Sequence, residues 1–87
     1  MIRLTSSTNG LTQIVKLEGK LVHPLTDQLI DVCRVALDQG KSVELDMSKT
    51  SYVDQPCLIV LQDLIRQGIV LISKSPFVSE LLKERFQ

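Results

Sequence analysis

The stretch VELDMSKTSYVDQPCL, from Val43 to Leu58, decides the fold of this 87-residue chain, because it predicts a strand, a turn and a helix start in succession. Its first half alternates apolar and polar residues, which is typical of a strand with one buried face and one solvated face. The apolar positions are Val43, Leu45 and Met47. A polar interval follows and predicts a turn from Ser48 to Asp54 that contains a short apolar pair, Tyr52 and Val53.

A helix is expected directly after Asp54. The aspartate can accept hydrogen bonds from N–H groups of the first turn, and Pro56 suits that turn because those N–H groups lack intrahelical partners. We therefore expect a helix over Gln55–Gln67 that ends at Gly68. Its buried arc is predicted to hold Cys57, Val60, Leu61, Leu64 and Ile65, with Leu58 at the margin. Its solvent side is predicted to hold Ile59, Gln62, Asp63 and Arg66.

The rest of the chain supplies three further strands and two further helices. The predicted strands are Ile2–Thr5, Thr12–Glu18 ending at Gly19, and a buried strand Ile69–Ile72, with a polar turn Ser6–Gly10 between the first two. The predicted helices are Leu25–Gln39, ended by Gly40, and one that begins at Ser75-Pro76. The inner face of the earlier helix should contain Leu25, Leu29, Val32, Cys33, Ala36 and Leu37.

This order, ββαβαβα, predicts an α/β domain with a mixed four-stranded sheet. The first two strands should form an antiparallel hairpin, and the later ones should be parallel and joined by helical crossovers. Alternation in three of the four strands indicates that one face is solvated, so the three helices should lie mainly on the other face in a two-layer arrangement. The open face, with Ile14 and Val70 or Ile72, leaves a homodimer possible.

The central stretch resembles the signature of STAS domains, the fold of bacterial anti-sigma factor antagonists. That signature runs leucine-aspartate-leucine-serine, a short loop, an apolar pair, then aspartate-serine-serine-glycine-leucine. The matching residues here are Leu45, Asp46, Met47, Ser48, Val53, Asp54 and Leu58, with further agreement at Gly19, Leu21, Leu29, Ser75 and Pro76. The resemblance implies a comparable mixed sheet and a protein partner.

The sequence departs from this family at the position that the resemblance makes functional. In partner-switching members the serine directly after the signature aspartate accepts phosphate, whereas this chain has Gln55 there, followed by Pro56 and Cys57. Glutamine has no hydroxyl, so phosphoryl transfer at this position is excluded. The segment from Asp54 to Ser75 is also shorter than usual, and the family's last elements are missing, so the chain resembles a short form without the phosphoacceptor serine.

Composition narrows the possible functions. Ten basic and ten acidic residues cancel, and aromatic residues make up 3% of the chain, which argues against nucleic-acid binding by charge or by base stacking. No apolar run approaches the roughly 18–20 residues that span a bilayer, and no signal peptide is evident. We expect a single cytoplasmic domain over residues 1–87, without membrane insertion, whose Cys33 and Cys57 are free thiols.

The candidate partner-binding surface combines the predicted turn with the exposed side of the following helix. Its members are Ser48, Thr50, Ser51, Asp54, Gln55, Pro56, Ile59 and Gln62. Ile59 is the most informative of them, because a branched apolar side chain on the solvent side of a helix is either incidental or a partner contact. The hydroxyls of Ser48, Thr50 and Ser51 are alternative phosphoacceptors.

Other chemistry finds little support in the sequence. Cys57 in a first helical turn is either a thiol with a lowered pKa or a small core residue. Asp46 and Asp54 suggest a cation or acid–base pair only in isolation, because no third ligand accompanies them. The single histidine, His23, has no companion for a metal, and the glycines are scattered, so we expect no metal, no cofactor and no catalysis.

Two functions remain open on this basis. The first is a non-enzymatic interaction module that resembles an anti-sigma factor antagonist and binds a protein, such as a serine-kinase-type anti-sigma factor, without a switch at Gln55. The second is a small STAS subunit of a larger assembly, such as a transport-ATPase complex or a signalling scaffold. A small-molecule binder or an enzyme is a third class, which the missing catalytic constellation disfavours.

Overall fold

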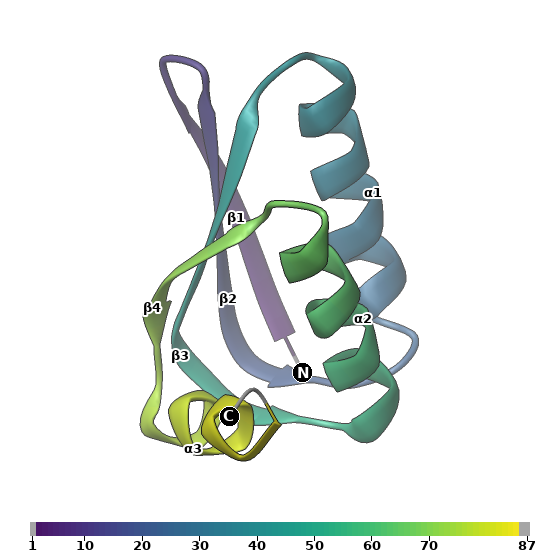
Figure 1. Cartoon of the computed structure of the whole chain (residues 1–87), viewed down its shortest axis with the longest axis vertical. Helices are drawn as coiled ribbons and strands as arrows, with labels where there is room; N and C mark the ends of the chain where they lie inside the picture. The colour runs from purple at the N-terminus through teal and green to yellow at the C-terminus, as the bar shows by residue number, and fades with distance from the viewer. Residues whose placement is uncertain (1, 86–87) are drawn as a thin grey trace.

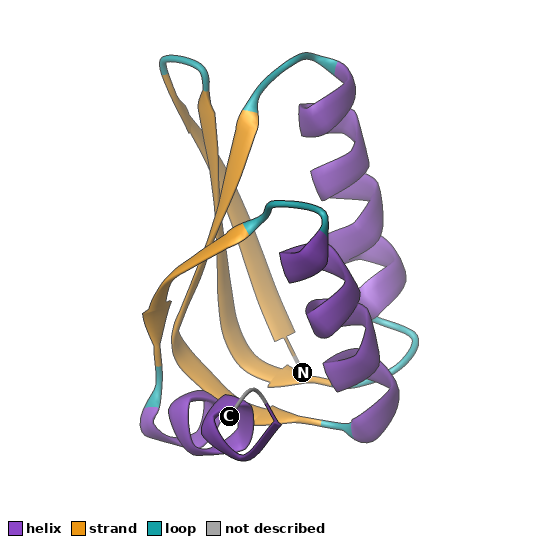
Figure 2. Cartoon of the chain, viewed as in Figure 1, coloured by secondary structure: helices purple, strands orange, loops and turns teal. Residues whose placement is uncertain are grey.

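A computed structural model describes the backbone of residues 2–85 and the side chains of residues 2–83. The elements are β1 (Ile2–Asn9), β2 (Thr12–Leu21), α1 (Thr26–Asp38), β3 (Ser42–Val53), α2 (Gln55–Arg66), β4 (Val70–Lys74) and α3 (Pro76–Arg85). The four strands form one sheet in the order β1-β2-β3-β4 (Figure 2). The predicted α/β class and the order ββαβαβα are therefore confirmed.

Strand directions follow from the connections. The hairpin makes β1 antiparallel to β2, whereas α1 and α2 are crossovers that make β3 parallel to β2 and β4 parallel to β3. Figure 1 shows α1 and α2 side by side on one face of the sheet, and α3 across the end where β3 and β4 finish. The other face of the sheet carries no helix in this view, as the alternation of the strands predicted.

The core lies between the sheet and these helices. Its fully buried side chains include Val15, Leu17, Leu29, Leu45, Met47, Leu58, Leu61 and Val78. Leu58 was predicted at the margin of α2 but is 1% exposed. Leu37 was predicted in the core but is 38% exposed, at the edge of the buried stripe, whereas Ala36 beside it is 3% exposed. Gly40, with φ of 76°, follows that turn as expected.

The hairpin is longer than its composition suggested. The predicted polar turn Ser6–Gly10 is wrong, because β1 continues to Asn9 and pairs with β2 over its whole length. The polar side chains are used across the strands: the Thr8 hydroxyl donates to Oε1 of Gln13 at 2.9 Å. Strand pairing satisfies the backbone here although the residues have little apolar surface to bury.

Both central strands also run further than predicted. Gly19 does not end β2; it lies in an irregular stretch with φ of 100°, and pairing with β3 resumes beyond it to Leu21. The predicted turn after Met47 is wrong for the same reason, since β3 is continuous from Ser42 to Val53 and its second half pairs with the extension of β2.

Strand β4 is only partly as expected. Ile69 is buried, but Val70 and Ile72 are 54% and 47% exposed, so the strand is not buried throughout, in agreement with the expectation that Val70 or Ile72 lies on the open face. The exposure alternates along β4, with Leu71 and Ser73 half-buried between the exposed residues, which is the pattern of a strand with one solvated face. After it, Ser75 caps α3 as predicted: its Oγ accepts a hydrogen bond from the N–H of Val78 at 3.2 Å. No helix of the described chain has the length and apolarity needed to cross a membrane.

Candidate functional site

Asp54 lies between β3 and α2 and forms hydrogen bonds to α2, to β2 and to the loop that follows β2. Its Oδ1 accepts a hydrogen bond from the N–H of Cys57 at 3.0 Å, which is the predicted cap of α2. Its Oδ2 accepts another from the N–H of His23 at 2.9 Å, in the loop that follows β2. The backbone N–H of Asp54 in turn donates to the carbonyl of Leu21 at 3.2 Å. One carboxylate therefore joins the ends of β2 and β3 to the start of α2.

This environment keeps Asp54 ionised. Hydrogen bonds from Cys57 and from the His23 amide hold the pKa of the Asp54 carboxyl below its usual value. A carboxylate at a helix start is also favoured by the positive end of the helix dipole. Because both oxygens serve as acceptors for backbone amides, Asp54 acts as a structural acceptor rather than as an acid or base.

The outer side of α2 begins immediately after Asp54. Gln55 and Pro56 are exposed, and Ile59, one turn further on, is 58% exposed, as the sequence predicted. Gln62 follows on the same side and is half-buried. These four residues, Gln55, Pro56, Ile59 and Gln62, are called the α2 surface below.

The α2 surface borders a groove between α1 and α2. The groove has a volume of about 560 Å³, and its lining includes Ile59 and Leu37 together with charged side chains of both signs. Leu37 was missed as a surface residue because helical periodicity alone places it with the buried stripe of α1. The end of the helix gives no signal for it, because Ala36 in the same turn is buried in the core.

The three hydroxyl residues of the predicted turn are separated by the strand. Thr50 was expected at the surface, which is wrong: it is 0% exposed, and its hydroxyl donates to the carbonyl of Leu17 at 2.8 Å. Ser48 is exposed, but its N–H and hydroxyl donate to Oδ1 of Asp46 at 3.0 and 2.7 Å, on the sheet face away from α1 and α2. Ser51 is exposed. Thr50 therefore does not belong to the surface expected from Ser48 to Gln62, whereas Ser48 and Ser51 stay accessible.

The cysteines belong to the core. Cys33 and Cys57 are free thiols, 1% and 0% exposed, as expected from the sequence. Burial raises the pKa of Cys33 to about 11. Burial, together with the neighbouring Asp54 carboxylate, raises the pKa of Cys57 to about 12. The 0% exposure of Cys57 and its raised pKa both argue against a reactive thiol activated by the helix start.

Asp46 has a local structural role as well. The N–H and hydroxyl of Ser48 hold the pKa of the Asp46 carboxyl below its usual value. The Asp46 carboxylate thereby accepts hydrogen bonds within β3, whereas the Asp54 carboxylate accepts one at the start of α2. Within the described part of the chain, no group of three or more His, Cys, Asp or Glu side chains is placed to hold a metal ion.

Comparisons with known proteins identify the fold through structure rather than through sequence. No family model matches the sequence, and no curated protein sequence matches it. The structure of the anti-sigma factor antagonist SpoIIAA in its unphosphorylated form matches with a TM-score of 0.71 and 18% identity, over 95% of this chain and 82% of SpoIIAA. An uncharacterized protein of the DUF3478 family from Shewanella loihica PV-4, with a SpoIIAA-like fold, matches with a TM-score of 0.59 and 16% identity. That match covers 87% of this chain and 70% of the other. The chain therefore has a SpoIIAA-like fold.

Proposed function

We propose that this protein is a non-enzymatic interaction module, similar in role to an anti-sigma factor antagonist, that binds a protein partner through the α2 surface. Its fold is that of SpoIIAA, an anti-sigma factor antagonist. The observation that carries the proposal is Ile59, a branched apolar side chain that is 58% exposed beside a braced helix start. Such a preformed apolar contact on a rigid element is suited to docking.

The proposed module has no phosphorylation switch at the start of α2. Phosphate on a hydroxyl adds about −1.5 to −2 charges and disrupts an interface built around a neutral side chain. Gln55, directly after the capping aspartate, is exposed and has no hydroxyl. The α2 surface would therefore stay neutral at this position and remain competent to bind.

The test begins with affinity capture from the native host and identification of the bound protein. Binding of the purified partner is then measured by calorimetric titration with wild type, Ile59→Asp and Gln55→Glu. Both variants should weaken binding by at least about tenfold, since each places a charge in a neutral contact. A glutamate in the first turn suits the helix dipole, so Gln55→Glu should fold normally.

Val35→Asp is the matched control. Val35 is a branched residue on a helix, is 56% exposed, and lies on α1 outside the α2 surface. Its variant should bind like wild type. Unchanged affinity of Ile59→Asp and Gln55→Glu would refute the proposed surface. Capture of a transport-ATPase or scaffold subunit, instead of a kinase-type regulator, would assign the module to a larger assembly.

A further inference from the structure

Strand β4 has an outer edge with no strand beside it. It pairs with β3, and among the described residues no element other than β3 forms a backbone hydrogen bond with residues 70–73. The N–H and C=O groups on this side are therefore available to an added strand. Ile72 has no partner in the β3–β4 register, so the regular hydrogen-bond ladder along β4 is short. Side-chain contacts must therefore supply much of the affinity for an added strand.

The two edges of the sheet differ in composition. On β1 the exposed residues from Thr5 to Asn9 are all polar, which is how edge strands commonly avoid association. On β4 the exposed residues include Val70 and Ile72, and Leu71 between them is half-buried. An apolar edge of this kind favours contact with another chain.

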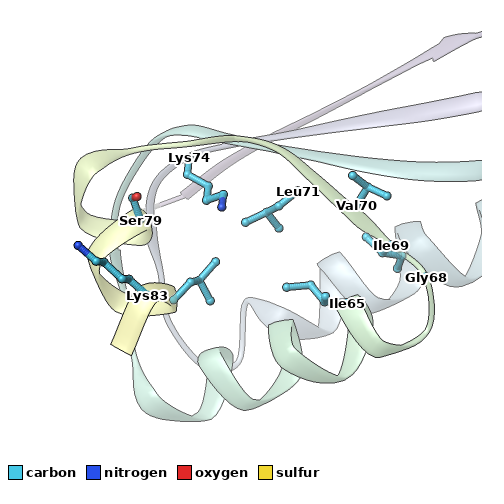
Figure 3. A pocket seen from close by; sticks show the side chains of 9 residues that line it. Ile65, Gly68, Ile69, Val70, Leu71, Lys74, Ser79 and Lys83 are labelled. Atoms are coloured by element: carbon cyan, nitrogen blue, oxygen red, sulfur yellow. The ribbon is translucent and has the colours of Figure 1, made fainter. Parts of the chain in front are cut away.

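A groove lies next to the β4 edge, between α2 and α3. It has a volume of about 670 Å³, and its apolar lining includes Ile65, Leu71 and Leu82. Its only charged lining residues, within the described part of the chain, are Lys74 and Lys83. Figure 3 shows Ile65 and Leu71 directed into the space between the ribbons, with both lysines toward the α3 end. The groove is thus apolar along its length and positive at one end.

We propose that an extended segment of a protein partner, apolar with acidic residues at one end, adds to β4 as a fifth strand. Its backbone pairs with the free edge of β4. Alternate side chains enter the groove, which Val70 and Leu71 both line, and the remaining ones cover Ile72, which does not line it. Its carboxylates lie beside Lys74 and Lys83.

Charge and geometry favour this occupant over two others. A second copy pairing through its own β4 would present VLISK, which has no acidic residue to meet the two lysines. A small amphiphilic carboxylate would fill the groove but would leave the strand edge unpaired and the exposed Ile72 uncovered. The β4 edge is separate from the α2 surface, so either proposal can fail alone.

The test is selection of a random decapeptide display library on the folded protein. We expect enrichment of proline-free peptides that alternate apolar residues and carry Asp or Glu at one end. The best peptide, labelled with fluorescein, is then measured by anisotropy against Lys74→Glu/Lys83→Glu and against Ile72→Asp. Both variants alter exposed side chains, and each should weaken binding by about tenfold or more. Ile59→Asp and Val35→Asp are controls and should bind like wild type.

Hydrogen exchange provides the second measurement. Saturating peptide should slow exchange of amides within residues 70–74, because an added strand gives them acceptors. Three results would overturn the proposal. The first is that no acidic, apolar peptide is enriched, and dodecanoate binding in the groove would then assign it to a small carboxylate. The second is peptide binding that survives the double charge reversal. The third is a dimer, seen by sedimentation equilibrium, that Ile72→Asp abolishes.

Discussion

The start of α2 and the outer edge of β4 both expose branched apolar side chains, but they differ in how their backbone is satisfied. At the start of α2, the N–H of Cys57 donates to the Asp54 side chain, the N–H of Leu58 donates to the Asp54 carbonyl, and Pro56 has no N–H, so these positions offer a partner no backbone donor. At β4, no strand of the described residues lies beside the outer edge. A partner can contact the first region through side chains, whereas at the second region it can also form backbone hydrogen bonds with the strand edge.

The largest expected effect concerns Cys57, which is buried in the first turn of α2. Its 0% exposure and raised pKa predict that a thiol reagent at neutral pH labels it only through unfolding. Labelling should be at least about a thousand-fold slower than in denaturant, which reflects the stability of a small domain. Mass spectrometry of peptides over time measures this. Rapid native labelling would show that the start of α2 opens locally.

The next effect concerns Ser75, which ties the end of β3 to α3. Its hydroxyl donates to the carbonyl of Thr50, and its Oγ also accepts the N–H of Val78. Ser75→Ala removes both bonds and should lower the free energy of unfolding by about 1–3 kcal/mol, measured by urea denaturation. Ser79→Ala, at an exposed position of α3, is the control and should change it by less than about 0.5 kcal/mol. Equal effects from the two variants would show that this tie contributes nothing.

A smaller, pH-dependent effect is expected at Asp54. Its pKa is lowered in the folded state, so its stabilisation is present above the unfolded pKa of about 3.9 and is lost as pH falls through the folded value. Asp54→Ala should therefore melt below wild type at pH 7, and the gap should narrow as the pH falls below about 5. Asp54→Asn keeps a capping acceptor, so its melting temperature should fall less than that of Asp54→Ala, and its stability should depend less on pH than that of wild type. A gap that stays constant with pH would contradict this.

The smallest effect is expected at the open edge. Val70→Lys and Ile72→Lys replace side chains that are 54% and 47% exposed and should each change the free energy of unfolding by less than about 0.5 kcal/mol. Urea denaturation of the isolated protein measures this. A loss above about 1 kcal/mol would show that the edge is packed within the monomer, and the contrast with the start of α2 would then disappear.

Local sequence signals predicted the parts of the site that depend on neighbours in the chain. Asp54 and Pro56 identified the start of α2, and the helical period placed Ile59 outside. The same signals failed at Thr50, where a polar run predicted an exposed turn. Its hydroxyl is buried against the Leu17 carbonyl, 33 residues away in sequence, and no local pattern reports such a partner.

The sequence by itself determined the class and order of the elements and the position of the α2 cap, because periodicity and capping act over a few residues. Only the tertiary structure decided how far β1, β2 and β3 extend, since strand length depends on the partner that accepts the backbone hydrogen bonds. It also decided that β4 is an edge with exposed Val70 and Ile72. Four apolar residues in a row do not reveal whether another strand pairs with the outer edge of the strand that they form.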